Sequence, residues 1–313
     1  HGHGKEHPKD LTAAGAGRVA FTQREPIGVV VAVSAFNHPL NLIVHQVGPA
    51  IATGCPVLVK PAGDTPLSCQ AFCDMSYEAG VPCKPEVAEK MVTDPRVAFF
   101  SFIGSADVGW MLRSKLAPGT RCALEHGGVA PVIVDDSADM DAMIPGLVKG
   151  GFYHSGQVCV SVQRVFALKQ QAEVIAQSLA DKAEKLVVGN AIEENTDCGP
   201  LIRPAEVNRV ADWVDEAVQG GARLMTGGNK LGDTTYAPTV LLNPALDAKV
   251  SVQEVFGPCV CVYAVDSIEQ AIAHANSLPY AFQASVFSKN IDVAMQAVRQ
   301  LDATAVMVND HTA

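Results

Sequence analysis

The stretch Ile27-Gly-Val-Val-Val-Ala-Val-Ser34 decides the fold of the first half of the chain. A run of β-branched residues without polar alternation is typical of a strand that is buried on both faces, as in a parallel sheet covered by helices. Asn37 to Pro39 predicts a turn, and Leu40–Thr53 predicts a helix that ends at Gly54. Cys55–Lys60 repeats the buried-strand pattern. This strand–helix–strand order predicts an α/β domain with a parallel, doubly wound sheet.

The same alternation continues to the end of the chain and predicts a second α/β domain. We expect further strands at Val97–Phe102, Arg121–Leu124, Pro131–Val134, Val160–Leu168, Arg223–Thr226, Thr239–Leu242, Cys259–Val265, Ala284–Ser288 and Ala305–Val308. We expect further helices from Asp64 or Thr65 to Glu78, at Pro85–Val92, after Ser105, and at Met140–Phe152, Gln171–Val187, Ile268–Ser277 and Ile291–Leu301.

The composition excludes several classes of protein. A net charge of −10 over 313 residues argues against nucleic acid or an anionic membrane as the main partner. No apolar run approaches the roughly 18 residues of a membrane span, and the His/Lys-rich N-terminus does not resemble a signal peptide. Nine cysteines without regular spacing predict free thiols and a cytoplasmic location. Cys259 and Cys261 lack a second Cys/His pair nearby, so we expect no metal site.

One cysteine differs from the others in its surroundings. Gly156-Gln157-Val158-Cys159 places it in a Gly-rich turn, just before the predicted strand Val160–Leu168. At such a junction a thiolate can be exposed and can be stabilised by backbone N–H groups. The alternative is a buried cysteine that acts as a small apolar residue. The other motifs of the chain decide between the two interpretations.

Seven short motifs follow one another between residues 24 and 258. They are Arg24-x-Pro-x-Gly28-Val-Val, Phe36-Asn37-x-Pro39, Val59-Lys60-Pro61-Ala62 with Thr65-Pro66, Phe102-x-Gly104-Ser105-x-x-x-Gly109, Glu125-x-Gly127-Gly128, Gly156-Gln-x-Cys159 and Glu254-x-Phe256-Gly257-Pro258. In this order the set resembles the aldehyde dehydrogenase superfamily of NAD(P)-dependent enzymes. The resemblance implies that family's fold: an incomplete, doubly wound, Rossmann-like cofactor domain and an α/β catalytic domain.

The resemblance also assigns a role to each part of the chain. Residues 1–23 are expected to form an extended arm involved in oligomerisation, 24–127 a partial dinucleotide-binding domain, and 128–313 the catalytic domain. Relatives are dimers or tetramers, so we expect a homodimer or homotetramer. The chain is short for the family at both ends and near residues 82–87, and we expect it to be a fragment or to be numbered through a gap.

The chemistry that the resemblance implies needs three catalytic groups. Aldehyde oxidation requires a nucleophile, and the Cys159 thiolate is the candidate. The Asn37 amide and the backbone N–H of Cys159 would stabilise the negative oxygen that forms. Glu125 would activate the water that hydrolyses the thioester. The simpler alternatives are an ordinary turn residue for Asn37 and a solvated carboxylate for Glu125.

A second set of residues is expected to bind NAD or NADP. Ser105, as the N-cap of a helix that follows a strand, would present the helix N-terminus to the pyrophosphate. Lys60 would reach the adenosine ribose and Glu254 the nicotinamide ribose, although both could be merely solvated. The expected cofactor-binding residues are Phe36, Lys60, Gly104, Ser105, Val108, Glu254 and Phe256.

The chain departs from the family pattern at three positions. Many NAD-preferring relatives have a glutamate where this chain has Gly63, so repulsion against a 2′-phosphate is absent and we expect NADP to be tolerated. His126 stands where leucine is usual and Ile103 where threonine is usual, which can change how the nicotinamide half is held.

The substrate is indicated by His38, next to the candidate oxyanion donor. An imidazole suits a small polar or anionic aldehyde, as in phosphonoacetaldehyde, lactaldehyde, glycolaldehyde and semialdehyde dehydrogenases. Two alternatives to hydrolytic aldehyde oxidation remain. A CoA-acylating relative usually lacks the base at Glu125. An idle binding or structural member would not need Asn37, Glu125 and Cys159 together.

Overall fold

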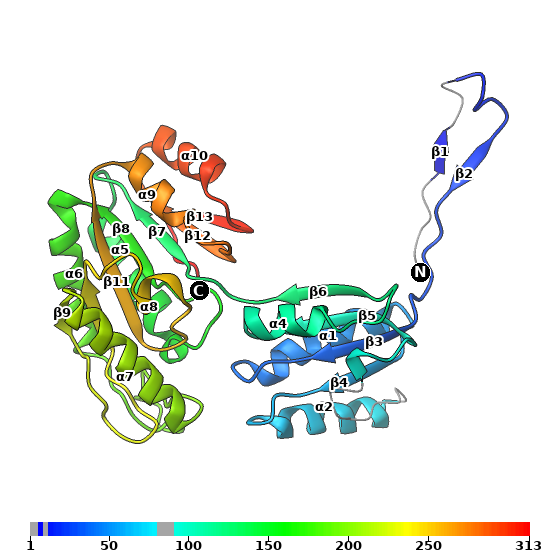
Figure 1. Ribbon diagram of the computed structural model, residues 1–313, viewed down its shortest axis with the longest axis horizontal. Coiled ribbons are helices and arrows are strands. Elements are labelled where there is room, and N and C mark those ends of the chain that lie inside the picture. Colours follow the sequence, from blue (N-terminus) through cyan, green and yellow to red (C-terminus); the bar gives the residue numbers. More distant parts are fainter. Residues whose placement is uncertain (1–5, 9–11, 80–90) are drawn as a thin grey trace. The chain divides into compact units, whose positions relative to one another are not determined.

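The computed structural model describes residues 6–8, 12–79 and 91–313. The chain divides into two compact units, His1–Glu125 and His126–Ala313, each with its own sheet and core. Figure 1 labels the elements of both. Among the described residues, no helix combines the length and the apolar character needed to cross a membrane.

The first unit contains a four-stranded sheet in the order β4-β3-β5-β6, with every neighbouring pair parallel (Figure 1). Its strands are β3 (Val29–Val33), β4 (Val57–Lys60), β5 (Val97–Ile103) and β6 (Arg121–Glu125). Its described helices are α1 (Pro39–Ala52), α2 (Pro66–Glu78) and α4 (Ala106–Arg113).

Alternate residues of β3 enter different cores. Ala32 packs with Ile43 of α1 and Cys69 of α2 on one face of the sheet. Val31 packs in a separate cluster that includes Leu112 of α4. Helices therefore cover both faces, and the predicted parallel, doubly wound arrangement is confirmed.

The N-terminal segment forms a narrow ribbon. β1 (Glu6–Pro8) pairs antiparallel with β2 (Val19–Phe21). Val19 and Phe21 are 84% and 71% exposed, so these apolar side chains of β2 are not buried within the chain.

The second unit contains a seven-stranded sheet in the order β13-β12-β7-β8-β11-β10-β9. All its pairs are parallel except β9–β10. Its strands are β7 (Pro131–Val134), β8 (Arg164–Leu168), β9 (Arg223–Thr226), β10 (Thr239–Leu242), β11 (Cys259–Val265), β12 (Gln283–Phe287) and β13 (Ala305–Val308).

Helices cover both faces of this second sheet as well. Helices α5 and α6 contribute to one buried cluster, and α7, α9 and α10 contribute to the other. The helical segments are α5 (Met140–Phe152), the 3-10 turn η1 (Tyr153–Gly156), α6 (Lys169–Ala183), α7 (Pro204–Gln219), α8 (Lys249–Val252), α9 (Ile268–Ala275) and α10 (Ile291–Gln300).

Two differences from the sequence predictions bear on the site, and two predictions lie wholly or mostly outside the described residues. The strand expected at Val160–Leu168 begins only at Arg164, because the Val162 N–H bonds Gly150 of α5 instead of a neighbouring strand. Helices α7 and α8 were not predicted. The gap expected near residues 82–87, and most of the predicted helix Pro85–Val92, lie outside the described residues.

Candidate active site

The predicted site residues of the first unit lie at the carboxyl edge of its sheet. Val33, the last residue of β3, pairs with Lys60 on one side and with Phe102 on the other, and Ile103 pairs with Glu125. The loops after these parallel strands therefore start at one edge. Successive strands are added on opposite sides of β3 here, and ligands of open α/β sheets bind at such a switch point.

The turn between β3 and α1 carries Phe36, Asn37 and His38. Asn37 is only 8% exposed, whereas Phe36 and His38 are half-buried. His38 is the N-cap residue of α1, and Pro39 begins the helix. The position of Pro39 agrees with its fixed φ, which suits the first turn of a helix.

Gln46 fastens α1 to the strand ends. Its Nε2 donates to the carbonyl oxygen of Val33 at 3.2 Å and to Oγ of Ser101 at 3.0 Å. Both acceptors lie near the carboxyl ends of β3 and β5. The turn with Asn37 is thereby held between a fixed strand and a fixed helix.

The start of α4 is shaped by the ring of Phe102. A Cβ on Gly104 would lie 2.7 Å from this ring, and a Cβ on Gly109 would lie 3.0 Å from it, which explains both glycines. Ser105 occupies the N-cap position, but its hydroxyl forms no capping hydrogen bond. Val108, in the first turn, is 43% exposed. Exposed N–H groups at such a helix start can receive an anion.

The remaining candidates of this unit are Lys60, Gly63 and Glu125. Lys60 and Glu125 end β4 and β6 and are half-buried. The Glu125 carbonyl accepts the Gly104 N–H at 3.1 Å, which ties the end of β6 to the start of the α4 loop. Gly63 is exposed and has no atom within 4 Å of an added Cβ, so a larger side chain would fit there.

In the second unit, the candidate residues lie at the amino edge of the sheet. The strands β7, β8 and β11 are neighbours, and the loops that precede them contain Gly127, Cys159 and Glu254. Gln163 and Arg164 both donate backbone N–H groups to the Ala130 carbonyl. The loops before β7 and β8 are therefore joined to each other where the strands begin.

Cys159 follows an unusual backbone turn. His154, Ser155 and Gly156 have φ values of 54°, 55° and 71°, in the left-handed region. A Cβ on Gly156 would lie 2.1 Å from the carbonyl oxygen of Gly257, so the loop of Cys159 is packed directly against the loop of Glu254. Cys159 itself is half-buried.

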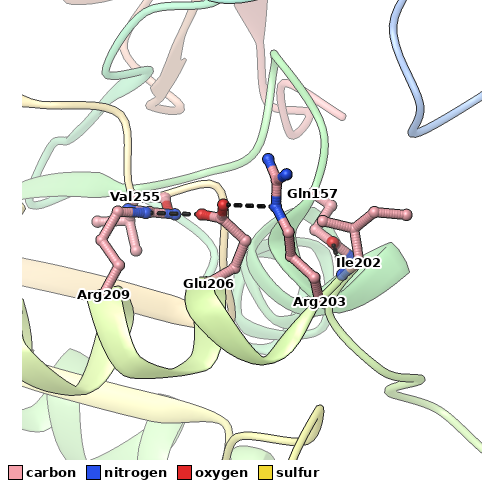
Figure 2. A network of polar contacts seen from close by, with 6 residues as sticks. All are labelled: Gln157, Ile202, Arg203, Glu206, Arg209 and Val255. Carbon is pink, nitrogen blue, oxygen red and sulfur yellow. Dashed lines mark hydrogen bonds and ion pairs between the residues drawn. The ribbon is translucent and has the colours of Figure 1, made fainter. Parts of the chain in front are cut away.

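Polar contacts fix this turn from two sides. Ser155 Oγ donates to the Gly199 carbonyl at 2.6 Å. Gln157 Nε2 donates to the Pro200 carbonyl at 3.2 Å. Its Oε1 accepts the N–H of Ile202, which lies beside it in Figure 2, at 2.9 Å. On the other side of the cysteine, Thr312 Oγ1 donates to the Val160 carbonyl at 2.6 Å.

Glu254 has the most perturbed carboxyl group of the site. A Cβ on Gly127 would lie 1.8 Å from its Oε1, so only a glycine leaves room for this carboxyl. Oε1 is buried and has no hydrogen-bond partner among the described residues. Burial raises the pKa of Glu254 to about 8, although the charge of Arg209 acts in the opposite direction. A buried acceptor without a partner is expected where a ligand binds.

The residues after Glu254 are clamped by two side chains. Gln163 Oε1 accepts the Val255 N–H at 2.9 Å, and Arg209 Nη2 donates to the Val255 carbonyl at 2.7 Å. These contacts hold the next residue, Phe256, at φ 46°. A bulky residue in the left-handed region persists only where its surroundings enforce it.

Arg209 is a candidate that the sequence patterns did not reveal. It lies on the unpredicted helix α7, and its Nη1 is buried without a partner among the described residues. The signal was the apolar spacing Val207, Val210, Ala211 and Val214 after Pro204, which is typical of an amphipathic helix.

Two sequence features have a structural explanation. Arg164, which is 2% exposed, donates to the carbonyls of Val129, His274 and Ala275 and thereby caps α9. His126, one of the departures from the family pattern, packs edge-on against Tyr280 with ring centroids 4.7 Å apart. Within the described part of the chain, no group of three or more His, Cys, Asp or Glu side chains could hold a metal ion, and no cysteine there forms a disulfide.

Comparisons with known proteins identify the family of the chain. The model of the aldehyde dehydrogenase family matches residues 2–313. A 3-sulfolactaldehyde dehydrogenase of Priestia aryabhattai is 38% identical over 99% of this chain and 67% of its own length.

Two solved structures share the fold. Aldehyde dehydrogenase 21 of Physcomitrella patens, in complex with the reaction product succinate, has a TM-score of 0.94 and 34% identity over 99% of this chain and 66% of its own. The glyceraldehyde-3-phosphate dehydrogenase of Methanocaldococcus jannaschii, complexed with NADP, has a TM-score of 0.92 and 32% identity over 99% of this chain and 69% of its own. The chain thus spans about two thirds of the length of these relatives. The family and fold expected from the seven motifs are confirmed, and the chain belongs to the aldehyde dehydrogenase family of NAD(P)-dependent oxidoreductases.

Proposed function

We propose that the chain oxidises a small polar or anionic aldehyde to the carboxylate with NAD(P)+, through a thiohemiacetal and a thioester on Cys159. The observation that carries this proposal is the packing of the Cys159 turn against the Glu254 loop. Gly156 touches Gly257, and the buried Oε1 of Glu254 has no hydrogen-bond partner among the described residues. A half-buried cysteine and an unsatisfied ligand-binding carboxyl thus belong to one rigid arrangement.

The chain's own groups have distinct chemical tasks in this proposal. The Cys159 thiolate attacks the aldehyde carbon. The Asn37 amide and the Cys159 N–H donate to the oxygen, which becomes negative as the carbon becomes tetrahedral. After oxidation to the thioester, Glu125 removes a proton from the water that releases the acid. The thiolate is regenerated when the carbon–sulfur bond breaks.

Bound NAD(P)+ supplies the hydride acceptor. The described residues fit a bound NAD(P)+, because Glu254 Oε1 is a buried acceptor and Arg209 Nη1 is a buried donor. Neither atom has a hydrogen-bond partner among the described residues. A ribose diol can donate to Oε1 of Glu254 and accept from the Arg209 guanidinium. Phe36, Lys60 and the α4 start with Gly104, Ser105 and Val108 would hold the remainder, and Phe256 would pack beside the nicotinamide.

Gly63 is the residue that we expect to decide whether NADP is accepted beside NAD. Its exposed position, with open space around an added Cβ, offers no carboxylate to repel a 2′-phosphate. We therefore expect NADP to be accepted beside NAD. The NADP-bound relative from Methanocaldococcus jannaschii agrees with such use in the family.

The substrate assignment rests on His38 and on the relatives. His38 follows Asn37 in the same turn and is half-buried. One relative is named a 3-sulfolactaldehyde dehydrogenase and another was solved with its reaction product succinate, and both compounds are anionic. We also propose that the chain forms a homodimer or homotetramer in which the apolar side chains of β2 in the 1–23 arm are covered.

The decisive experiment measures NAD(P)H formation with propionaldehyde, glycolaldehyde, 3-sulfolactaldehyde and phosphonoacetaldehyde, with NAD or NADP, with and without CoA. Wild type should turn over without CoA and prefer anionic aldehydes, whereas Cys159→Ala should be inactive. Glu125→Gln should release about one NAD(P)H per site and then stop, because the thioester is not hydrolysed. No NAD(P)H with any aldehyde, or an absolute need for CoA, would contradict the proposal.

A further inference from the structure

The first two turns of α7 connect the Cys159 loop to the Glu254 loop. Just before the helix, the Ile202 N–H is bound by Gln157, two residues from the cysteine. In the second turn, Arg209 donates to the carbonyl of Val255, which follows Glu254. Figure 2 shows Arg209, Glu206 and Arg203 in a row along the helix, with Val255 beside Arg209 and with Gln157 and Ile202 at the other end.

Glu206 joins Arg203, at the start of the helix, to Arg209 in its second turn. Its Oε1 accepts from Nε of Arg203 at 3.2 Å and its Oε2 accepts from Nε of Arg209 at 2.8 Å. The Arg209 guanidinium also lies over the ring of Trp213, 4.6 Å from its centroid. Although burial opposes it, hydrogen bonds from both arginines lower the pKa of Glu206, so the carboxylate is charged and orients Arg209.

At the start of α7, both the nitrogen and the oxygen of the Gln157 side-chain amide form hydrogen bonds. Gln157 is 5% exposed; its Nε2 donates to the carbonyls of His154 and Pro200, and its Oε1 accepts from Ile202. Its amide therefore supplies both donors and an acceptor to backbone groups. Removal of this side chain would leave buried backbone groups without partners and would release the start of α7.

We propose that Gln157 and Glu206 are positioning residues, which fasten the Cys159 loop and the Glu254 loop to the same two turns of α7. The helix then acts as a template that sets the separation of the nucleophile from the proposed ribose ligand. The functional meaning of this template rests on the proposed function, but the mechanical connection between the loops does not.

A direct route between the loops also exists, because Gly156 touches Gly257. The two routes are separable. Glu206→Gln removes the ionic contacts along α7 and leaves the glycine contact intact. A change in the Cys159 loop of this variant therefore starts from the α7 contacts and not from the glycine contact.

The test is hydrogen–deuterium exchange followed by mass spectrometry, which needs neither cofactor nor turnover. Two peptides report, one with the Ser161 N–H, which bonds Val158, and one with the Val255 N–H, which bonds Gln163. Glu206→Gln should speed exchange in both by about tenfold, the effect of losing a hydrogen bond to a charged group. Gln157→Ala should do the same from the opposite end.

Glu173→Gln is the matched control. It removes the carboxylate of another ion pair of the same unit, Arg223–Glu173 at 2.5 Å, which joins α6 to β9 and contacts neither loop. Exchange in both peptides should stay at the wild-type rate. The proposal would be overturned if Glu206→Gln and Gln157→Ala each speeded exchange in only one of the two peptides. It would also be overturned if Glu173→Gln speeded exchange as much as they do.

A binding measurement adds a functional readout. The Kd for NADP should rise in Gln157→Ala as well as in Glu206→Gln, and the double variant should be no weaker than about the worse single variant, because both cut the same connection. Multiplicative effects would show two independent sites and refute the template. If wild type forms no NAD(P)H or does not bind NADP, the proposed function fails while the exchange experiment still decides the template.

Discussion

Replacement of Gly156 by alanine tests the central contact of the site. The added Cβ would lie 2.1 Å from the Gly257 carbonyl oxygen and 2.5 Å from its carbon, so one of the two loops must move. Gly156 also has a φ of 71°. The backbone term costs about 1–2 kcal/mol, and overpacking adds about 1–3 kcal/mol. We therefore expect the free energy of unfolding to fall by about 2–5 kcal/mol.

Gly221→Ala separates the two terms. Gly221 lies in the same unit, has a positive φ of 102°, and has no atom within 4 Å of an added Cβ. It carries the backbone cost without the clash, and the entropy that alanine removes from the unfolded chain is the same in both variants. Gly156→Ala should thus be about 1–3 kcal/mol less stable than Gly221→Ala.

The assay is urea unfolding followed by the fluorescence of Trp213, in a Trp110→Phe background, because Trp110 belongs to the other unit. The rate of Cys159 alkylation by iodoacetamide is measured in parallel and should change in Gly156→Ala alone. Equal losses of stability in the two alanine variants would refute the packing of the Cys159 loop against Gly257.

Three further outcomes follow from single residues. Because burial raises the pKa of Glu254 to about 8, the folded chain keeps a proton that the unfolded chain releases. The free energy of unfolding should therefore fall between about pH 4.5 and pH 8, by at most about 1.4 kcal/mol per pH unit. Glu254→Gln should flatten this slope in urea titrations. Gly63→Glu fits sterically and should raise the KM for NADP about tenfold with little change for NAD; an unchanged ratio of kcat/KM values would remove the role of Gly63. Arg164→Met leaves the carbonyls of Val129, His274 and Ala275 without their donor and should cost about 3 kcal/mol by calorimetry, whereas a loss below about 1 kcal/mol would show that water replaces the guanidinium.

The elements that the sequence predicts well are those with one dominant signal. Buried valine runs identify β3 and β11, and helix α5 has the bounds predicted for it, Met140–Phe152. Boundaries fail where a tertiary contact replaces a local preference. The residues before Arg164 have strand-like letters, yet Val162 bonds Gly150 of α5, so β8 starts late.

The candidate site was predictable as far as its motifs reach. Gly127 and Gly156 belong to motifs, but only the structure shows why each is a glycine. Gly127 leaves room for Oε1 of Glu254, and Gly156 leaves room for the carbonyl of Gly257 in the same loop. Arg209 belongs to no motif, and its contact with Val255 spans 46 residues of sequence. Such a contact depends on the packing of α7, which local patterns do not encode.

The distribution of thiols has a chemical consequence. Six of the eight described cysteines are buried, and only Cys122 and Cys159 are half-buried. Burial raises the pKa of Cys198 to about 12, with a further contribution from the charge of Asp197, and the pKa of Cys259 is raised by its hydrogen bond with Cys261 and by burial. Electrophiles and peroxides react with accessible thiolates, so among these cysteines chemical damage should concentrate on Cys159 and Cys122. Oxidative stress would then inactivate the protein at its proposed nucleophile well before it unfolds the core.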